Sequence, residues 1–571
     1  MKTLIKKLLA DWEYDAPERS LSRTSVTVMF LAVLLVVMIP VFLMDFPSRD
    51  VALRYAPMAD ALADGNFNYA FHPRIPMLHP LLAGVVAFLT GCSGFMACKV
   101  VSALFFAAGV VPLCGLMKRI FDRRTAMISA IIYACSTPLM PLGYSGLRDS
   151  AKSFLLLVMA YALVLIFQER RNFRGYALCG LSCGLAFLVR VDLIILSIVL
   201  LWAMFFLECR CCRCAARSFA GLALTVLGAL PGFIQNYLQT GAAVPDSYTG
   251  TQMIKLIGRN ITVPEMIFTG IAAVTVIYIS SLLLSWVKRQ YLLRLLPAAG
   301  VIAAGGLVYW CRSNTLSWQQ EYWKGVFWGS MAYYWIVVLP GIIIRIWRKE
   351  WRRTDTLLAL FFVLHFVVVA GQFILFKKRF YVSDRYLESA LPLLFGWAAY
   401  FTVMVWNLLD FTQKKWLYPR WCLRTAAAVL IAVPLMIYMI FAYVPVLKLV
   451  GQGQKKRTLT ELHRIADKIR THGVETDDDG SCLIDRLEYV PPCKTGMIYF
   501  EYRNGRWWRN RNANLVVSYF ANVKLVDSNG DYVLYVWKKS APPPRKPSRP
   551  GKMLLKTDDG EKEFQLWSAK R

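Results

Sequence analysis

Hydrophobic runs long enough to cross a bilayer alternate with short polar connections along most of the chain. A spanning helix needs about 20 mostly apolar residues. The first run, 26–44, has no charged residue and is too long for a signal peptide, so we expect an uncleaved spanning helix. About thirteen spans are predicted, which makes the expected fold class a polytopic α-helical membrane protein. The predicted spans are 26–44, 96–117, 125–142, 151–167, 174–189, 191–207, 218–236, 264–286, 292–311, 326–346, 355–376, 386–408 and 423–446.

Lysine and arginine gather in alternate connections, such as KRIFDRR, QERRNFR and RIWRKEWRR. Short basic connections lie on the cytoplasmic side of a membrane. The N-terminus is therefore expected in the cytoplasm, and an odd number of spans places the C-terminal part outside, in a multi-pass protein of the plasma (inner) membrane. The connection KKRFYVSDRY, which starts at Lys377, falls on the outer side and opposes this rule. A basic outer cluster of this kind indicates a function.

The chain becomes polar from about residue 450. TLTELHRIADKIRTHG has helical spacing, with Leu462 and Ile465 on one face, and several short runs such as TGMIYFEY and DYVLYVWKK are typical of strands. A small extracytoplasmic α/β domain is expected here. The predicted organisation is a cytoplasmic amphipathic N-terminus (1–25), a transmembrane domain (26–449), the α/β domain (450–540) and a flexible proline-rich basic tail (541–571).

Composition agrees with a membrane protein, since 57% of the 571 residues are hydrophobic and 18% are charged. A formal net charge of +30 raises the question of nucleic-acid binding, but the basic residues come as short clusters between apolar runs. We therefore expect membrane lipids as partners and no nucleic acid. No metal motif and no cofactor motif is visible, although a carboxylate site could take a divalent ion.

The first outer loop, 46–95, is too polar for a simple turn. Residues 51–65 have helical spacing with an apolar face, and Gly65 suits the end of that helix. An amphipathic helix at the outer membrane surface is predicted. Asp50 stands at its start, where a carboxylate either caps the helix or acts as a catalytic group.

Further charges fall on the same outer side. Arg148 and Asp149 begin the fourth predicted span, Arg190 and Asp192 follow the fifth, and Arg385 precedes the twelfth. Ionisable residues at such positions either serve a function or pair with one another. Several arginines with a few carboxylates suit an anionic substrate that carries phosphate, because arginine binds phosphate through two hydrogen bonds.

Four local patterns resemble the GT-C superfamily of polyprenyl-phosphate-sugar-dependent glycosyltransferases, in the branch of the protein O-mannosyltransferases and the lipid A aminoarabinose transferase. They are DVALRYAPMADALADG (50–65), MLHPLL (77–82), LPGFIQNYLQTGAAVPDS (230–247) and SDRYLESALPLLFGWAA (383–399). The chain departs from the family pattern at three places. Val51 stands where a second acid is common, Gln235 where arginine is usual, and His79-Pro80 where Lys-Pro-Pro is usual.

The resemblance implies an enzyme that moves a sugar from a polyprenyl-phosphate donor to an acceptor hydroxyl on a protein, a glycolipid or a cell-envelope polymer. It implies Asp50 as the base, while Asp149 positions the acceptor or orients an arginine. The substrate-binding residues expected from the resemblance and the charges are Arg54, Tyr55, His79, Arg148, Arg190, Asn236, Tyr237, Lys378, Arg379, Arg385 and Tyr386. Two alternatives remain open at the level of sequence. They are a transporter or flippase of lipid or sugar, and a catalytically inactive GT-C scaffold that binds lipid.

Overall fold

The structure is a computed structural model. It describes residues 22–43, 50–71, 75–136, 138–169, 173–190, 193–208, 212–240, 332–375, 385–415, 461–466, 496–501, 523–526, 532–538, 552–558 and 562–568. The predicted spans 264–286, 292–311 and 423–446 and the basic residues Lys378 and Arg379 lie outside these ranges.

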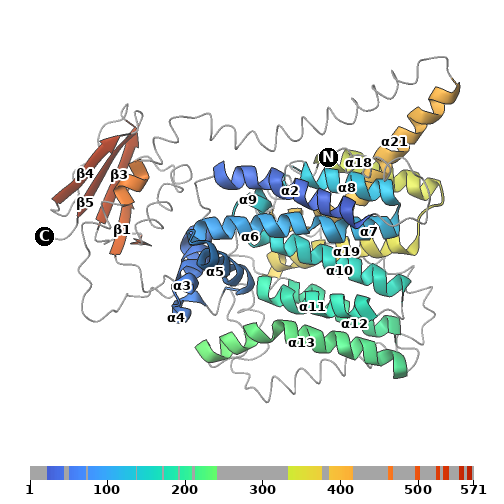
Figure 1. Cartoon of the computed structure of the whole chain (residues 1–571), viewed down its shortest axis with the longest axis horizontal. Helices are drawn as coiled ribbons and strands as arrows, with labels where there is room; N and C mark the ends of the chain where they lie inside the picture. The colour runs from blue at the N-terminus through green and yellow to red at the C-terminus, as the bar shows by residue number, and fades with distance from the viewer. Residues whose placement is uncertain are drawn as a thin grey trace.

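Helices form the described part of the chain up to residue 415 (Figure 1). In Figure 1 the long helices lie side by side, with α6 and α7 above α10, followed by α11, α12 and α13. α11 packs against α10, α12 and α13. The helices are α2 (Arg23–Leu43), η1 (Val51–Tyr55), α3 (Ala56–Ala63), α4 (Phe67–Ala70), α5 (Leu78–Thr90), α6 (Gly94–Ala108), α7 (Val110–Ile120), α8 (Arg123–Ala134), α9 (Met140–Tyr144), α10 (Asp149–Gln168), α11 (Phe173–Val189), α12 (Leu193–Glu208), α13 (Cys212–Thr240), α18 (Ala332–Trp347), α19 (Arg353–Leu375), α20 (Arg385–Glu388), η3 (Leu391–Leu394) and α21 (Phe395–Lys415).

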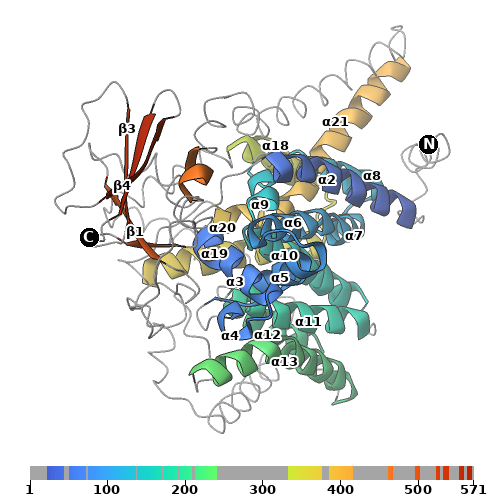
Figure 2. The same cartoon turned by 60° about the vertical axis from the view of Figure 1, so that its left-hand side comes forward.

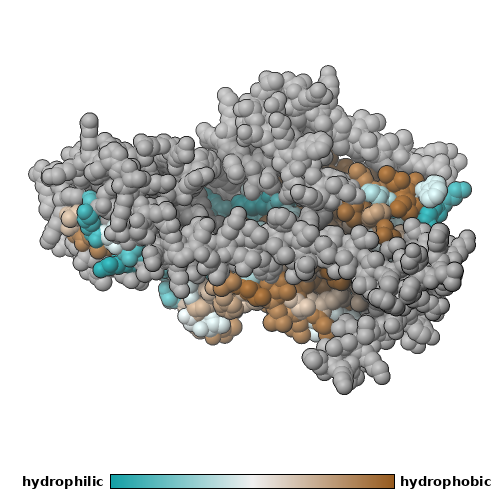
Figure 3. All heavy atoms as spheres, turned by 90° about the horizontal axis from the view of Figure 1, so that it is seen from above, coloured by the Kyte–Doolittle hydropathy of each residue, from teal (hydrophilic) through white to brown (hydrophobic). Residues whose placement is uncertain are grey.

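Four helical segments among the described residues are long and apolar enough to cross a membrane: Arg23–Leu43, Gly94–Ile120, Asp149–Gln168 and Ala216–Leu238. The first of them leaves large apolar side chains uncovered, including Leu35 at 70% and Phe42 at 62% exposure. Hydrophobic side chains also gather in the brown areas of the surface in Figure 3. Such a surface suits contact with lipid. The expected class, a polytopic α-helical membrane protein, is confirmed.

Proline divides two of the predicted spans. The run 125–142 forms α8 and the short α9, separated by a turn at Pro138, and Pro141 lies in the first turn of α9. The run 386–408 begins with α20 and the 3₁₀ helix η3, which contains Pro392, before α21 starts at Phe395. Proline lacks the backbone N–H that a continuous helix requires, so it favours the start of a new helix.

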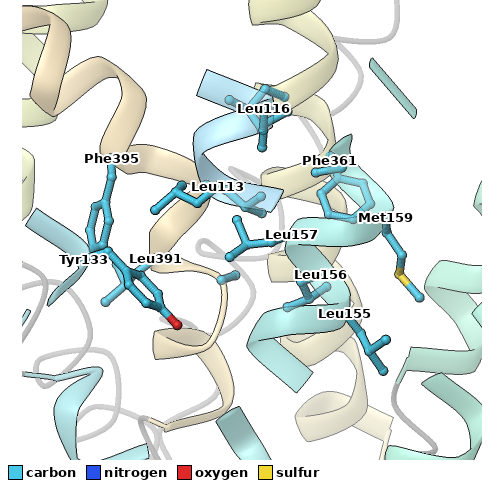
Figure 4. Close-up of a cluster of buried hydrophobic side chains, with 14 of the residues drawn as sticks. Leu113, Leu116, Tyr133, Leu155, Leu156, Leu157, Met159, Phe361, Leu391 and Phe395 are labelled. Atoms are coloured by element: carbon cyan, nitrogen blue, oxygen red, sulfur yellow. The ribbon is translucent and has the colours of Figure 1, made fainter. Parts of the chain in front are cut away.

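The buried core joins segments that are far apart in the sequence. Figure 4 shows Leu113 of α7 and Leu156 of α10 beside Phe361 of α19 and Phe395 of α21. Burial of large apolar side chains against a common centre holds α19 and α21 to the N-terminal helices.

Small residues set the contact between α11 and α13. A Cβ atom at Gly180 would lie 2.0 Å from the carbonyl oxygen of Gly221, and one at Gly184 would lie 2.4 Å from that of Thr225. Both distances are far below any real Cβ contact. The two backbones therefore approach as closely as in the small-residue contacts that are common between membrane helices.

Five strands form one sheet near the C-terminus, in the order β2-β1-β3-β5-β4. β1 pairs in parallel with β2 and β3, and the remaining pairs are antiparallel. The strands are β1 (Gly496–Glu501), β2 (Val523–Val526), β3 (Tyr532–Lys538), β4 (Lys552–Asp558) and β5 (Lys562–Ser568). The short helix 461–466 buries Leu462 and Ile465 as predicted, and its Glu461 accepts a hydrogen bond from Thr557 of β4.

The sheet corrects one expectation from the sequence. The flexible tail expected over 541–571 is wrong for residues 552–558 and 562–568, because β4 and β5 pair with each other in antiparallel and β5 also pairs with β3. The prediction of a flexible tail followed from the proline-rich composition of the segment before β4, and the two strands lie after that segment. Residues 541–551 lie outside the described ranges.

Candidate active site

The first outer loop folds into helices, as predicted. The π-helical turn η1 continues into α3, and Gly65 ends this segment in a left-handed conformation (φ 75°). Val51, Tyr55, Met58 and Ala59 are all buried. A π-turn adds a residue to the helical turn and is frequent at functional sites. Here Asp50 immediately precedes this turn.

Asp50 does not cap this helix. Its backbone is already helical (φ −65°, ψ −33°), and its side chain makes no capping hydrogen bond. A capping residue normally has an extended backbone and accepts a bond from the next turn. The side chain of Asp50 faces arginines instead, so the capping interpretation is wrong.

Two arginines hold the carboxylate of Asp50. Nη2 of Arg385 donates to Oδ2 at 2.9 Å, and Nη1 of Arg54 donates to Oδ1 at 3.4 Å. Arg385 lies 335 positions along the chain from Asp50. Figure 2 brings this end of the molecule forward, with α20 close to α3. The side chains of Asp50 and Arg385 remain 27% and 23% exposed, so solvent or substrate can reach both.

Arg385 connects Asp50 to the second carboxylate of the site, Asp149. Its Nε atom lies 3.6 Å from Oδ2 of Asp149, while Oδ1 of Asp149 accepts from Nη1 of Arg190 at 2.7 Å. The Asp149 side chain is only 1% exposed. Asp149 is therefore a buried anchor for two arginines. The guanidinium of Arg190 also lies 4.2 Å from the ring centre of Tyr386.

Electrostatics keep Asp50 ionised. Burial raises the pKa of its carboxyl, but the charge and hydrogen bond of Arg385, with further charge from Arg54 and Arg148, lower the pKa more. The net effect is a pKa below the usual value of an aspartate. Burial lowers the pKa of Arg385, but the negative charges of Asp149 and Asp50 raise it by a larger amount, so the guanidinium stays charged.

Arg148 offers donors that no described residue uses. Its guanidinium lies 5.7 Å from the ring centre of Tyr55, and its Nε and Nη1 atoms are buried without a hydrogen-bond partner among the described residues. An unbonded donor of this kind carries a free-energy cost that an anionic ligand would remove. Arg148 is thus well suited to bind an anion.

His79 is a buried neutral side chain. Ser102 Oγ donates to the Leu147 carbonyl oxygen at 2.7 Å, so His79 Nε2, at 3.1 Å from Oγ, is the donor of that pair. Nδ1 then carries a lone pair, and it has no hydrogen-bond partner among the described residues. Burial and the charge of Arg148 lower the pKa of His79 to about 3. A neutral acceptor nitrogen suits a hydroxyl and repels phosphate, so the geometry favours a structural or acceptor-binding role.

Two buried lysines near these residues escaped the sequence analysis. Lys152, on α10, is fully buried and donates to the Tyr386 carbonyl oxygen at 3.1 Å. Lys99, on α6, is 1% exposed and donates to the Val41 carbonyl oxygen at 2.6 Å, near the end of α2. Each lysine interrupts an apolar run, and an ionisable residue in such a run is a candidate for function. That signal was present in the sequence.

Two further predicted site residues lie on α13, where Asn236 is buried and Tyr237 is 49% exposed. Asp60 of α3 accepts a hydrogen bond from the backbone N–H of Gly94, the first residue of α6. Within the described ranges, no group of three or more His, Cys, Asp or Glu side chains could hold a metal ion.

Comparisons with known proteins agree with this architecture. A family model described as dolichyl-phosphate-mannose-protein mannosyltransferase matches residues 72–234. No curated protein sequence matches the chain. The crystal structure of ArnT from Cupriavidus metallidurans in the apo state matches with a TM-score of 0.55 and 11% identity, over 95% of this chain and 98% of ArnT.

The same enzyme bound to undecaprenyl phosphate matches with a TM-score of 0.54 and 12% identity, over 96% and 99% of the two chains. An Archaeoglobus fulgidus oligosaccharyltransferase matches with a TM-score of 0.49 and 13% identity, over 87% of this chain and 62% of its own. The family model and the ArnT fold confirm the resemblance seen in the four sequence patterns. The chain therefore has the fold of the GT-C glycosyltransferases.

Proposed function

We propose that this protein is an integral-membrane glycosyltransferase that moves a sugar from a polyprenyl-phosphate-linked donor to an acceptor hydroxyl at the outer membrane face. The fold of ArnT supports this proposal, and one matched ArnT structure holds undecaprenyl phosphate, a ligand of the proposed class.

The observation that carries the proposal is the cluster of arginines around Asp50 and Asp149. Arg385 contacts both carboxylates, and Arg54 and Arg190 contact one each. Arg148 lies beside them, and its buried Nε and Nη1 atoms have no hydrogen-bond partner among the described residues. Buried or half-buried positive charge is costly unless an anion compensates it. A phosphate that gains charge during the reaction is such an anion.

The transfer needs one proton acceptor and one site for a leaving phosphate. Asp50 takes the proton of the acceptor hydroxyl while the oxygen of that hydroxyl bonds to the anomeric carbon of the sugar. The bond from that carbon to the phosphate oxygen breaks, and the electron pair leaves with the polyprenyl phosphate. Arg385 and Arg148 stabilise the added charge, because preorganised cations favour the transition state. Asp149 is a positioning residue that orients Arg190 and Arg385.

The test uses the purified full chain in lipid nanodiscs. Incubation with a panel of polyprenyl-phosphate sugars and hydroxyl acceptors, followed by mass spectrometry, should reveal a labelled acceptor and free polyprenyl phosphate. Asp64→Asn, an exposed carboxylate on the same loop, is the matched control for Asp50→Asn. Transfer that survives Asp50→Asn unchanged would remove Asp50 from the mechanism.

One observation favours a second candidate, a GT-C scaffold that binds polyprenyl lipid without turnover. The two arginines on Asp50 weaken it as a base, because a carboxylate with a lowered pKa accepts a proton less readily. The same incubation separates the candidates, since a scaffold would bind the lipid phosphate and release no labelled acceptor.

A further inference from the structure

The guanidinium of Arg385 meets two carboxylates through one edge. Nε and Nη2 point in the same direction from the planar group, and Nη2 bonds Asp50 while Nε faces Asp149 at 3.6 Å. The Nε atom makes no hydrogen bond with any described residue. The edge thus faces both carboxylates, but only Nη2 donates a hydrogen bond, and its acceptor is Asp50.

The two carboxylates differ in how firmly they are held. Asp149 is 1% exposed and has a 2.7 Å bond from Arg190 in addition to Arg385. Asp50 is 27% exposed, and its other contact, from Arg54, is longer at 3.4 Å. Asp149 is held by Arg190 and makes no hydrogen bond with Arg385, so the bond to Asp50 is the one that an anion at this edge would compete with.

We propose that the donor phosphate binds the Nε–Nη2 edge of Arg385 and takes this arginine away from Asp50. The inference rests on the proposed function and deepens it. Phosphate prefers a bidentate contact with this edge, because two parallel N–H donors match two of its oxygens. Phosphate on both donors competes with Asp50 for Nη2, whose bond to Asp50 is 2.9 Å long.

The displacement changes what Asp50 can do. The charged groups that face it are Arg54 on its own helix, Arg148 at the start of α10 and Arg385 on α20, while Asp149 lies behind Arg385. Phosphate neutralises the nearest of these cations and adds negative charge close by. Both changes make the carboxylate a better proton acceptor. Asp50 becomes an effective base once the donor is bound, which orders the reaction with the donor first and the acceptor second.

The test measures binding of undecaprenyl phosphate to the purified full chain. Asp50→Asn removes the competitor for Arg385, so it should tighten binding by about two- to fivefold, the range expected for a partly exposed ion pair. Asp64→Asn measures the general effect of losing a carboxylate from this loop. The gain in affinity beyond that of the Asp64→Asn control should disappear in an Arg385→Gln background, because phosphate and Asp50 then have no arginine to compete for.

The outcomes separate this inference from the proposed function. The proposed competition is refuted if Asp50→Asn leaves the affinity for undecaprenyl phosphate unchanged or weaker. It is also refuted if the gain in affinity persists with Arg385→Gln. Neither result contradicts the proposed class of donor. Failure of the wild-type chain to bind the lipid phosphate overturns both. Thermal unfolding of each variant verifies the fold, and Arg385→Lys, which keeps the charge but loses the bidentate edge, repeats the cycle should the glutamine variant unfold.

Discussion

The two carboxylates of the site should respond differently to the same substitution. Asp50→Asn and Asp149→Asn each replace a charged side chain by a neutral one of similar size. The Asp50 pairs are partly exposed at 27% for the carboxylate, and pairs of this kind contribute about 0–1 kcal/mol to stability. Asp149 is 1% exposed against an Arg190 side chain at 9%. Removal of one charge from such a pair leaves the other buried and uncompensated, which typically costs about 3–5 kcal/mol.

Asp50→Asn should therefore affect mainly the rate of transfer, and Asp149→Asn mainly the stability of the protein. Loss of a general base slows the chemical step by about 10²–10⁴-fold, so Asp50→Asn should reduce single-turnover transfer by this factor in a protein that remains folded. Asp149→Asn should lower the free energy of unfolding by about 3 kcal/mol, near the lower end of its range, because the asparagine oxygen can still accept one hydrogen bond.

The assay pairs single-turnover transfer with unfolding measured on the same nanodisc preparation. Two results would refute the reasoning. Asp50→Asn that transfers sugar within about tenfold of the wild type is not missing its base. Equal losses of stability in both variants would mean that Asp50, like Asp149, is an anchor and that its effect on turnover is structural.

Three further perturbations test separate parts of the structure. Gly180→Ala should destabilise the protein by about 1–3 kcal/mol in thermal unfolding, because its Cβ would meet the Gly221 carbonyl oxygen, whereas Leu181→Ala on the exposed face should have little effect. The folded state holds His79 neutral and the unfolded chain does not, so stability should fall by up to about 1.4 kcal/mol per pH unit as pH drops from about 6.5 towards 3. His79→Gln should flatten that decline in a pH series of unfolding curves, and an unchanged slope would contradict the neutral assignment. Arg148→Gln should weaken binding of polyprenyl phosphate by about tenfold or more, since charged hydrogen bonds contribute about 1.5–3 kcal/mol, and unaltered affinity in a lipid titration would argue against an anion at its unbonded donors.

The site shows where sequence reasoning succeeded and where it stopped. Arg148, Asp149, Arg190 and Arg385 were predicted on one side of the membrane from topology alone, and the structure brings them together with Asp50. The capping role offered for Asp50 failed, because the cap depends on backbone angles that a π-turn changes. A pattern of residue types carries no information on such angles.

Lys152 and Asn236 show the same limit of sequence reasoning, since one was overlooked and the other was chosen from a motif. Lys152 was overlooked within an apolar helix, yet its Nζ reaches the backbone of Tyr386 across 234 positions of sequence. Asn236 was expected at the site because its sequence pattern resembles the family's. The structure buries it on α13, and its place at the site stays a prediction. A motif predicts the type of residue at a position, and packing decides what it touches.

The sequence by itself determined the hydrophobic helices and the amphipathic helix after the first span, and the side of the membrane on which the charges gather stays a prediction from topology. These features are local, because hydropathy and residue spacing act within a few turns of chain. Only the tertiary structure decided that Arg385 serves Asp50 and Asp149 together, while Arg190 belongs to Asp149. Those pairings depend on how α3, α10 and α20 pack, and helix packing is set by side-chain shape along surfaces that are distant in sequence.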